Sequence, residues 1–135
     1  MAATLLPNGN VLVVGGQDAS ANALSAVEIY NPSTNTWSTG PSMAVPRYRM
    51  SAVLLDNGLV LVAGGTNGPP FGFADGLSAV ELYNPTTNTW TTGPSLPVGT
   101  NWPVVATLRC GYVLFAGGDD NGGLAATQLY VPAPF

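Results

Sequence analysis

The sequence predicts an all-β fold assembled from repeated four-stranded units. The first observation is an internal repeat: residues 24–42, LSAVEIYNPSTNTWSTGPS, return as residues 77–95, LSAVELYNPTTNTWTTGPS. The second is an apolar run that ends in a Gly-Gly pair in three places, at Gly15 and Gly16, Gly64 and Gly65, and Gly117 and Gly118. A period of about 50 residues built from short strand-like pieces indicates a propeller-type array, in which each unit covers its hydrophobic faces by stacking on its neighbours.

Composition supports strands and excludes several function classes. Only 7% of the 135 residues are charged, and the polar surface consists mainly of Asn, Thr, Ser and Gly, which suit strands and turns. The net charge of -4 and three scattered arginines predict that nucleic acid is not a partner. No apolar stretch approaches the roughly 20 residues of a membrane span, so no membrane partner is expected. The N-terminus does not resemble a signal peptide, as is also true of a secreted chain that has lost its signal, and the compartment stays open.

The second copy is complete, and its first hairpin defines the start of a unit. Residues 51–55 are predicted as the first strand, followed by Asp56, Asn57 and Gly58. Asn-Gly between two apolar runs is a strong hairpin signal because both residues tolerate the positive φ of a type I′ turn. Residues 59–63 form the second strand, which is apolar at every position, and this predicts that both of its faces are covered. Gly64 and Gly65 are expected to end it.

The second half of the same copy supplies two further strands. Residues 78–83 are predicted as the third strand, Asn84 and Pro85 as the turn, and residues 89–92 as the fourth strand. Four antiparallel strands make one blade of a propeller. The predicted division is one array over residues 1–135, with repeat 1 at 1–49, repeat 2 at 50–102 and a truncated repeat 3 at 103–135.

The third copy is short and degraded. Its hairpin is expected at residues 109–112, with Cys110 at an exposed tip as a free or crosslinking thiol. Trp37 and Trp90 each follow the repeat tyrosine by seven residues, but the equivalent position after Tyr130 lies beyond the last residue of the sequence. We therefore predict two complete blades and a third blade of three strands.

The recurring pattern resembles the kelch repeat. A Gly-Gly pair, a tyrosine on the third strand, a tryptophan seven residues later and Pro-Arg before the next unit carry the resemblance, which covers essentially the whole chain and is similar to the variety found in bacterial kelch proteins and galactose-oxidase-like propellers. The repeat positions are Gly15, Gly16, Tyr30, Trp37, Gly64, Gly65, Tyr83, Trp90, Gly117, Gly118 and Tyr130. The resemblance implies a β-propeller that serves mostly as a scaffold, with protein or sugar contacts made by its loops.

The absence of histidine argues against catalysis. Copper radical oxidases with a related fold need histidine ligands and a Tyr–Cys crosslink, which Cys110 and Tyr112 cannot complete alone. Triads with histidine, imidazole-bound zinc and imidazole acid–base chemistry fail for the same reason. We expect no enzyme activity, catalytic residue, metal or cofactor. Glu28 and Glu81 occupy the same repeat position, which favours a structural pairing with Arg47, and the acidic loop at 119–123 is expected to be a solvated turn rather than a Ca²⁺ site.

Two sets of residues are candidates for binding. The loop at residues 66–76 carries Phe71 and Phe73, which either anchor a partner or fold back over the neighbouring blade. The second set lies in the two segments that connect the units and consists of Arg47, Tyr48, Arg49 and Trp102, since an aromatic ring beside arginine suits sugar or peptide stacking. The alternative for Arg47, which the resemblance favours, is packing into the blade.

The strand count predicts an open arc with two uncovered apolar faces. Closed propellers have typically about four to eight blades. If each open face presents on the order of 500 Å² of apolar surface, its burial contributes roughly 12 kcal/mol before association costs. We therefore predict a non-enzymatic interaction module that stacks blade on blade with itself, as a dimeric ring of about six blades or as a filament. The alternatives are a carbohydrate-binding propeller domain or a fragment of a longer secreted kelch or galactose-oxidase-like protein.

Overall fold

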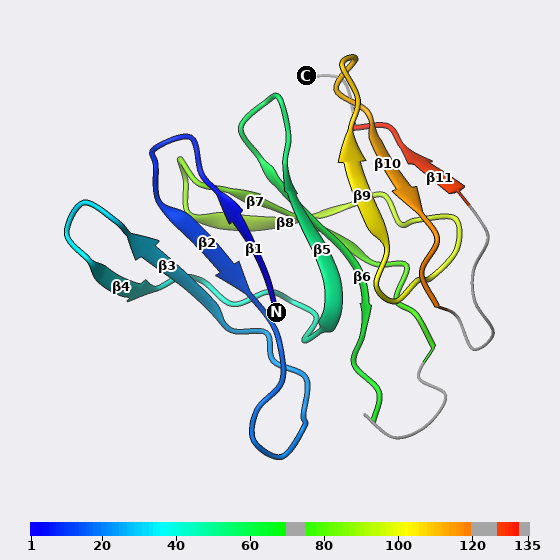
Figure 1. Ribbon diagram of the computed structural model, residues 1–135, viewed down its shortest axis with the longest axis horizontal. Coiled ribbons are helices and arrows are strands. Elements are labelled where there is room, and N and C mark those ends of the chain that lie inside the picture. The colour runs from blue at the N-terminus through cyan, green and yellow to red at the C-terminus, as the bar shows by residue number, and fades with distance from the viewer. Residues whose placement is uncertain (70–74, 120–126, 133–135) are drawn as a thin grey trace.

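The chain folds into a fan of three antiparallel sheets (Figure 1). The computed structural model describes residues 1–69, 75–119 and 127–132. These residues contain eleven strands and no helix, in sheets of four, four and three strands. We number the sheets as blades 1 to 3 in chain order. The all-β prediction and the count of two complete blades and one three-stranded blade are confirmed, and the array is an open arc.

Each blade is a meander in which consecutive strands pair. Blade 1 contains β1 (Ala2–Leu5), β2 (Val11–Val14), β3 (Val27–Asn31) and β4 (Thr36–Thr39). Blade 2 contains β5 (Tyr48–Leu54), β6 (Val60–Thr66), β7 (Val80–Asn84) and β8 (Thr89–Gly93). Blade 3 contains β9 (Val104–Thr107), β10 (Val113–Ala116) and β11 (Thr127–Tyr130). Residues 40–47 and 94–103 connect the blades and are called the first and second crossing segments.

The predicted Asn-Gly hairpin is present, but its turn differs from type I′. Gly58 has a φ of +84°, whereas Asn57 does not adopt a positive φ. The Asn57 side-chain oxygen accepts a hydrogen bond from the Leu59 backbone N–H at 2.9 Å, and the Leu55 N–H donates to the Leu59 carbonyl at 2.8 Å. The asparagine therefore stabilises the turn through its side chain, and only glycine takes the left-handed conformation.

The prediction that Gly64 and Gly65 end the second strand is wrong. β6 runs through both glycines to Thr66, and β5 begins three residues before its predicted start, because Tyr48 pairs with Thr66 and Met50 with Gly64. Gly65 has a φ of +83°, and a Cβ there would meet the Tyr48 carbonyl oxygen. In blades 1 and 3 the strand does end before the glycine pair. The predicted boundary at residues 49 and 50 lies inside β5, and the division into repeats stays a prediction.

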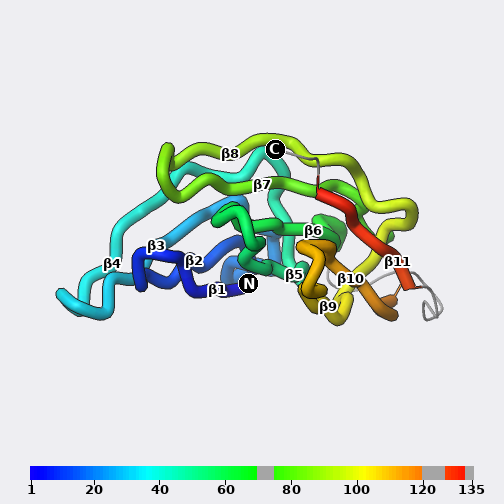
Figure 2. Tube along the Cα trace, turned by 90° about the horizontal axis from the view of Figure 1, so that it is seen from above, coloured from blue at the N-terminus to red at the C-terminus, as the bar shows by residue number. Residues whose placement is uncertain are grey.

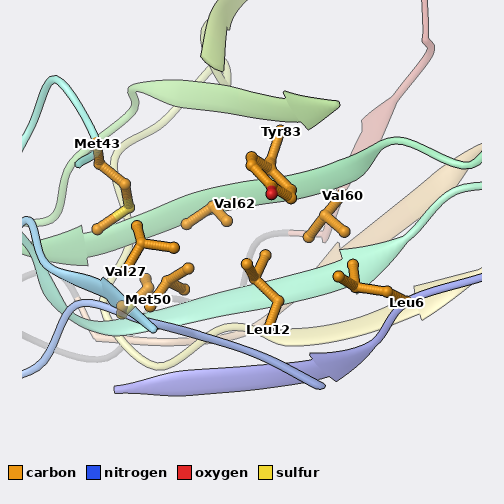
Figure 3. Packing of buried hydrophobic residues seen from close by; sticks show 9 residues of the cluster. Leu6, Leu12, Val27, Met43, Met50, Val60, Val62 and Tyr83 are labelled. Carbon is orange, nitrogen blue, oxygen red and sulfur yellow. The ribbon is translucent and has the colours of Figure 1, made fainter. Parts of the chain in front are cut away.

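The hydrophobic core consists of two clusters, one at each contact between blades. The first packs side chains of blade 1 against side chains of blade 2 (Figure 3) and contains Leu6, Leu12, Val14, Val27, Met43, Met50, Val60, Val62 and Tyr83. The second joins blades 2 and 3 and contains Leu55, Leu61, Ala63, Val80, Leu96, Val113, Phe115 and Tyr130. β6 contributes to both clusters and is buried along its whole length, as its unbroken apolar run predicts.

Arg47 joins blade 1 to blade 2. Its backbone N–H donates to the Leu24 carbonyl and its carbonyl accepts from the Gly16 N–H, both at 3.0 Å, so its main chain belongs to blade 1. Its guanidinium reaches blade 2, where Nη1 donates to the carbonyls of Gly64 and Ala79. Nη2 lies 2.8 Å from Glu81 Oε2, and the two side chains are 0% and 4% exposed. This ion pair is therefore a buried contact between the blades.

Glu81 completes the junction by binding the first crossing segment. Its carboxylate accepts hydrogen bonds from the backbone N–H groups of Ala44 at 2.6 Å and Val45 at 3.3 Å. Burial lowers the pKa of Arg47, and the charge and hydrogen bond of Glu81 oppose this shift. The predicted pairing with Arg47 is confirmed for Glu81. It is wrong for Glu28, whose side chain is exposed in blade 1 because no blade precedes it in the structure.

Uncharged residues make the same connection between blades 2 and 3. Thr100 stands at the repeat position of Arg47, and its backbone exchanges hydrogen bonds with Leu77 and Gly65 of blade 2. Its hydroxyl donates to the Gly117 carbonyl of blade 3 at 3.2 Å. Gln128, at the position of Glu81, accepts from the Val98 N–H at 2.9 Å. The same repeat positions therefore form hydrogen bonds between blades at both junctions, but only the first junction contains charged residues.

Replacing Arg47 is expected to destabilise the chain strongly. Arg47→Ala leaves the buried Glu81 carboxylate without its counter-charge, so the free energy of unfolding in urea should fall by about 3–5 kcal/mol. The matched control is Arg109→Ala at an exposed turn, which should change it by less than about 0.5 kcal/mol. Equal effects of the two substitutions would contradict the assignment of Arg47 as the junction.

Candidate functional site

Three predicted binding residues, Tyr48, Arg49 and Trp102, lie together where the two crossing segments lead into β5 and β9. The Arg49 guanidinium carbon lies 4.1 Å from the centre of the Trp102 ring and 5.1 Å from that of Tyr48. The backbone N–H of Trp102 donates to the Arg49 carbonyl at 2.8 Å, and this hydrogen bond joins the second crossing segment to β5. Tyr48 is buried and its hydroxyl donates to the Gly68 carbonyl, whereas Trp102 is 58% exposed. Arg49 therefore stacks between a buried and an exposed aromatic ring.

The backbone holds Arg49 and Trp102 in an uncommon conformation. Their φ angles are +59° and +50°, in the left-handed region that residues other than glycine rarely adopt. The two residues occupy the same repeat position, so the conformation belongs to this place in each unit. Such conformations cost of order 1–3 kcal/mol and persist where the surrounding contacts determine them. Here the cation–π stack and the backbone hydrogen bond supply those contacts.

A shallow hollow of about 340 Å³ opens beside this stack. It is lined by Met1, Gln17, Tyr48, Arg49, Met50 and Trp102. The inner strands β1, β5 and β9 lie along one edge of the arc, and Figure 2 shows this edge with the N-terminus near its middle. Met1 and Gln17 were not predicted as site residues, because only folding brings the start of β1 and the glycine loop of blade 1 to Arg49. The hollow offers an aromatic face and a guanidinium to a small polar ligand.

The outer face of blade 1 is apolar and uncovered. Trp37 is 59% exposed, whereas its repeat counterpart Trp90 is partly buried and donates from Nε1 to the Pro41 carbonyl at 2.7 Å. Leu5 is 60% exposed and Glu28 is also exposed, although Glu81 at the same position is buried. This surface, the N-terminal face, therefore presents the groups with which blade 2 binds the blade before it.

The outer face of blade 3 is the opposite end of the arc. Val104 is 70% exposed and Leu129 is 47% exposed. Leu108 is 37% exposed, whereas the leucine at the same position of blade 2, Leu55, is only 4% exposed because blade 3 covers it. This surface, the C-terminal face, corresponds to the side of a blade that packs on the next blade. The two faces are therefore complementary halves of the contact that the molecule makes twice internally.

Several predicted features cannot be placed or lack the geometry of a site. Phe71, Phe73 and residues 120–123 of the acidic loop lie outside the described residues. Cys110 is an exposed free thiol between β9 and β10, where the hairpin was predicted. Among residues 1–69, 75–119 and 127–132, no group of three His, Cys, Asp or Glu side chains could hold a metal ion. The same residues include no helix long and apolar enough to cross a membrane.

Comparison with known proteins defines the class of this molecule. The fold is that of propeller blades, and the family model described as the kelch motif matches residues 1–44 and 47–97. The chain belongs to the kelch-repeat family. It is 35% identical over 92 residues to a galactose oxidase of Gibberella zeae, and 36% identical over 104 residues to kelch repeat and BTB domain-containing protein 12 of Danio rerio. These matches cover 67% and 76% of this chain but only 12% and 15% of the two relatives.

Two solved structures share the fold. A fungal alcohol oxidase in complex with copper superposes with a TM-score of 0.80 over 92% of this chain and 28% of that protein, at 18% identity. The structure of YjhT gives a TM-score of 0.69 over 88% and 34%, at 21% identity. Kelch relatives therefore include enzymes. The residues of this chain do not fit a histidine-ligated copper site, because the sequence contains no histidine.

Stability is expected to fall in alkaline solution. Burial raises the pKa of Tyr83 and Tyr130 above the ordinary value of 10.0. Their hydroxyls ionise at lower pH in the unfolded chain than in the folded chain, so stability is complete below about pH 10 and is lost as pH rises through the folded pKa values. Urea midpoints measured from pH 8 upward test this, and Tyr83→Phe should flatten the decline. Tyr112→Phe, at an exposed ring, is the control, and a decline unchanged by Tyr83→Phe would contradict the expectation.

Proposed function

We propose that the chain is a non-enzymatic kelch module that assembles with a second copy of itself by stacking blade on blade. The observation that carries the proposal is the N-terminal face, where Glu28 and Trp37 stand at the positions with which Glu81 and Trp90 hold the preceding blade. The C-terminal face presents Val104 and Leu129 as the apolar counterpart. In a second copy, the C-terminal face can cover the N-terminal face of the first, and its N-terminal face can cover the C-terminal face of the first.

Geometry favours two copies in a ring. Each chain contributes three blades, so two chains supply about six and three chains about nine, and closed propellers have typically about four to eight. A closed pair covers both open faces of both chains. If the rotation between blades does not close, the same contact continues as a filament.

A role outside catalysis is supported by the chemistry of the chain. Without histidine, the described side chains provide no imidazole base, and no cluster of acidic or thiol groups gathers in the described part of the molecule. The polar groups of its junctions are engaged in holding blades together. The named activities of the oxidase relatives belong to proteins of which this chain covers a small part.

Assembly is tested by the mass of the particle. Light scattering at micromolar concentration should give twice the 13.8 kDa of one chain, or a series of larger multiples for a filament. Trp37→Glu and Val104→Glu, one on each open face, should each yield a monomer because they place a charge in the contact. Ser95→Glu, at an exposed position of the second crossing segment, is the matched control and should leave the mass unchanged. A stable, folded wild-type monomer would refute self-assembly.

The Arg49–Trp102 stack supports carbohydrate binding as a second candidate function. An exposed indole ring packs on the apolar face of a sugar, and the adjacent guanidinium donates hydrogen bonds to hydroxyl or carboxylate oxygens. The positive φ of Arg49 and Trp102 keeps the Trp102 ring at the rim of the hollow. A glycan ligand is therefore the chemistry that this hollow suits best.

Carbohydrate binding is tested with a glycan array followed by calorimetry. Trp102→Ala should weaken the affinity for any captured glycan by about tenfold, the typical contribution of an aromatic contact. Tyr112→Ala is the matched control, because its ring is exposed but does not line the hollow. An array without binding, or equal losses for the two variants, would remove this candidate.

A further inference from the structure

The turns of the first hairpins of blades 1 and 2 lie next to each other along one edge of the arc. The β1–β2 turn contains Pro7 and Asn8, and the β5–β6 turn contains Asn57 and Gly58. A Cβ at Gly58 would lie 3.9 Å from Pro7 Cγ, which is an ordinary van der Waals contact. Figure 1 shows both turns at the same edge of the fan. The two turns are therefore close enough to form one surface.

A hollow of about 480 Å³ opens at this edge between blades 1 and 2, and we call it the hairpin hollow. The β7–β8 turn completes its wall. Most of the lining consists of three asparagines, two prolines and a leucine: Asn8, Asn57, Asn84, Pro7, Pro85 and Leu59. Met1 precedes β1 and lines the hollow beside Arg49, whereas Pro7 follows β1 and lines this one. The two hollows therefore lie at opposite ends of the inner strands.

The three asparagines of the hairpin hollow hold their side-chain oxygens in their own turns. Oδ1 of Asn8, Asn57 and Asn84 accepts the backbone N–H of the residue two positions later, at 3.0, 2.9 and 2.9 Å. These hydrogen bonds fix which end of each carboxamide is the oxygen. Within the described part of the chain, none of the three amide nitrogens donates a hydrogen bond. Each nitrogen therefore retains two N–H donors for a ligand.

The rest of the lining is uncharged. The rings of Pro7 and Pro85 and the side chain of Leu59 offer apolar surface, and Thr86 adds an exposed hydroxyl. No charged side chain lines the hollow, and the acidic residue next to it in sequence, Asp56, opposes the approach of an anion. The hairpin hollow therefore suits a neutral ligand.

Donors outnumber free acceptors in this hollow, and this difference selects among neutral ligands. A peptide brings a backbone N–H donor with each carbonyl and needs acceptors in return, but the asparagine oxygens are already engaged in the turns. A saccharide hydroxyl accepts through two lone pairs and can turn its own hydrogen toward water. The apolar C–H face of a sugar ring can pack on a proline ring. The lining therefore matches a saccharide better than a peptide.

The contact between blades 2 and 3 does not repeat these groups. Asp56 stands at the repeat position of Pro7, and Cys110 at that of Asn57. A Cβ at Gly111 would lie 3.5 Å from Asp56 Oδ2, so the two turns approach each other as they do at the first contact. There, however, a carboxylate replaces a proline ring and a thiol replaces an amide. The combination of donors and apolar rings thus belongs to the contact between blades 1 and 2.

We propose that the hairpin hollow binds a neutral saccharide through the amide N–H groups of Asn8, Asn57 and Asn84. The sugar ring packs against the prolines, and its hydroxyl oxygens accept from the amides. The lining includes no residue assigned above to the N-terminal or C-terminal face and none of the Arg49–Trp102 stack. The site therefore depends neither on self-assembly nor on the other candidate for carbohydrate binding.

The test titrates the full-length, isotope-labelled chain with the neutral disaccharides maltose, cellobiose and lactose and follows the side-chain amide signals by NMR. At least one disaccharide should give saturable shifts of the NH₂ signals of Asn8, Asn57 and Asn84. Its affinity should be the same at low and high salt, because no ionic contact is made. Trp102→Ala should leave the titration unchanged, which separates this site from the hollow beside Arg49.

An asparagine-to-aspartate variant separates the amide donor from the turn. In Asn84→Asp, a carboxylate oxygen still accepts in the turn but the N–H donors are lost, so the affinity should fall about fivefold. Asn31→Asp is the matched control, because Asn31 has the same repeat position and the same turn hydrogen bond in blade 1 but does not line the hollow. Asn57→Asp repeats the comparison in a second turn if Asn84→Asp fails to fold.

Three results would overturn the proposal. They are the absence of shifts with all three disaccharides, equal losses of affinity in Asn84→Asp and Asn31→Asp, and loss of the shifts in Trp102→Ala. A monomeric wild-type chain that binds a disaccharide in the expected way would support this site while refuting self-assembly.

Discussion

The rest of the structure depends on one residue position in each crossing segment. The main chain of this residue forms hydrogen bonds with one blade, and its side chain forms hydrogen bonds with the next blade. At the first junction this residue is Arg47, whose buried guanidinium links blade 1 to two carbonyls and a carboxylate of blade 2. At the second junction Thr100 makes a weaker version of the same link. Because β-sheets stack through apolar side chains without directional contacts, these polar links set the position of one blade on another.

This repeated junction explains which side chains are exposed at the two ends of the arc. A blade has one face that receives a crossing segment, through Glu81 or Gln128, and one face that is covered by the next blade. Blade 1 retains the receiving face with Glu28 and Trp37, and blade 3 retains the face to be covered. The exposed groups at the two ends of the arc therefore stand at the same repeat positions as groups that are buried between blades.

The strands and blades were predictable from the sequence because local signals and the repeat agree. The apolar run of β6 and the Asn-Gly turn identified the central hairpin of blade 2, and the internal repeat identified four strands in each of blades 1 and 2. The extension of β6 through Gly64 and Gly65 was missed, since glycine usually interrupts a strand, whereas here its positive φ allows close pairing with β5. The cluster of Tyr48, Arg49 and Trp102 was predicted from position, but the contribution of Met1 and Gln17 was not, because they are distant in sequence.

The sequence by itself determined the all-β class and the succession of blades, because both follow from a period and from pairing between neighbouring segments. Only the tertiary structure decided which of two equivalent residues is buried. Glu28 and Glu81 have nearly the same neighbours in sequence, as do Trp37 and Trp90, yet one member of each pair lies under a preceding blade and the other is exposed. It also decided that the Tyr130 hydroxyl is enclosed without a partner. Burial depends on which blade stacks on which, and that is a property of the assembled arc rather than of any single repeat.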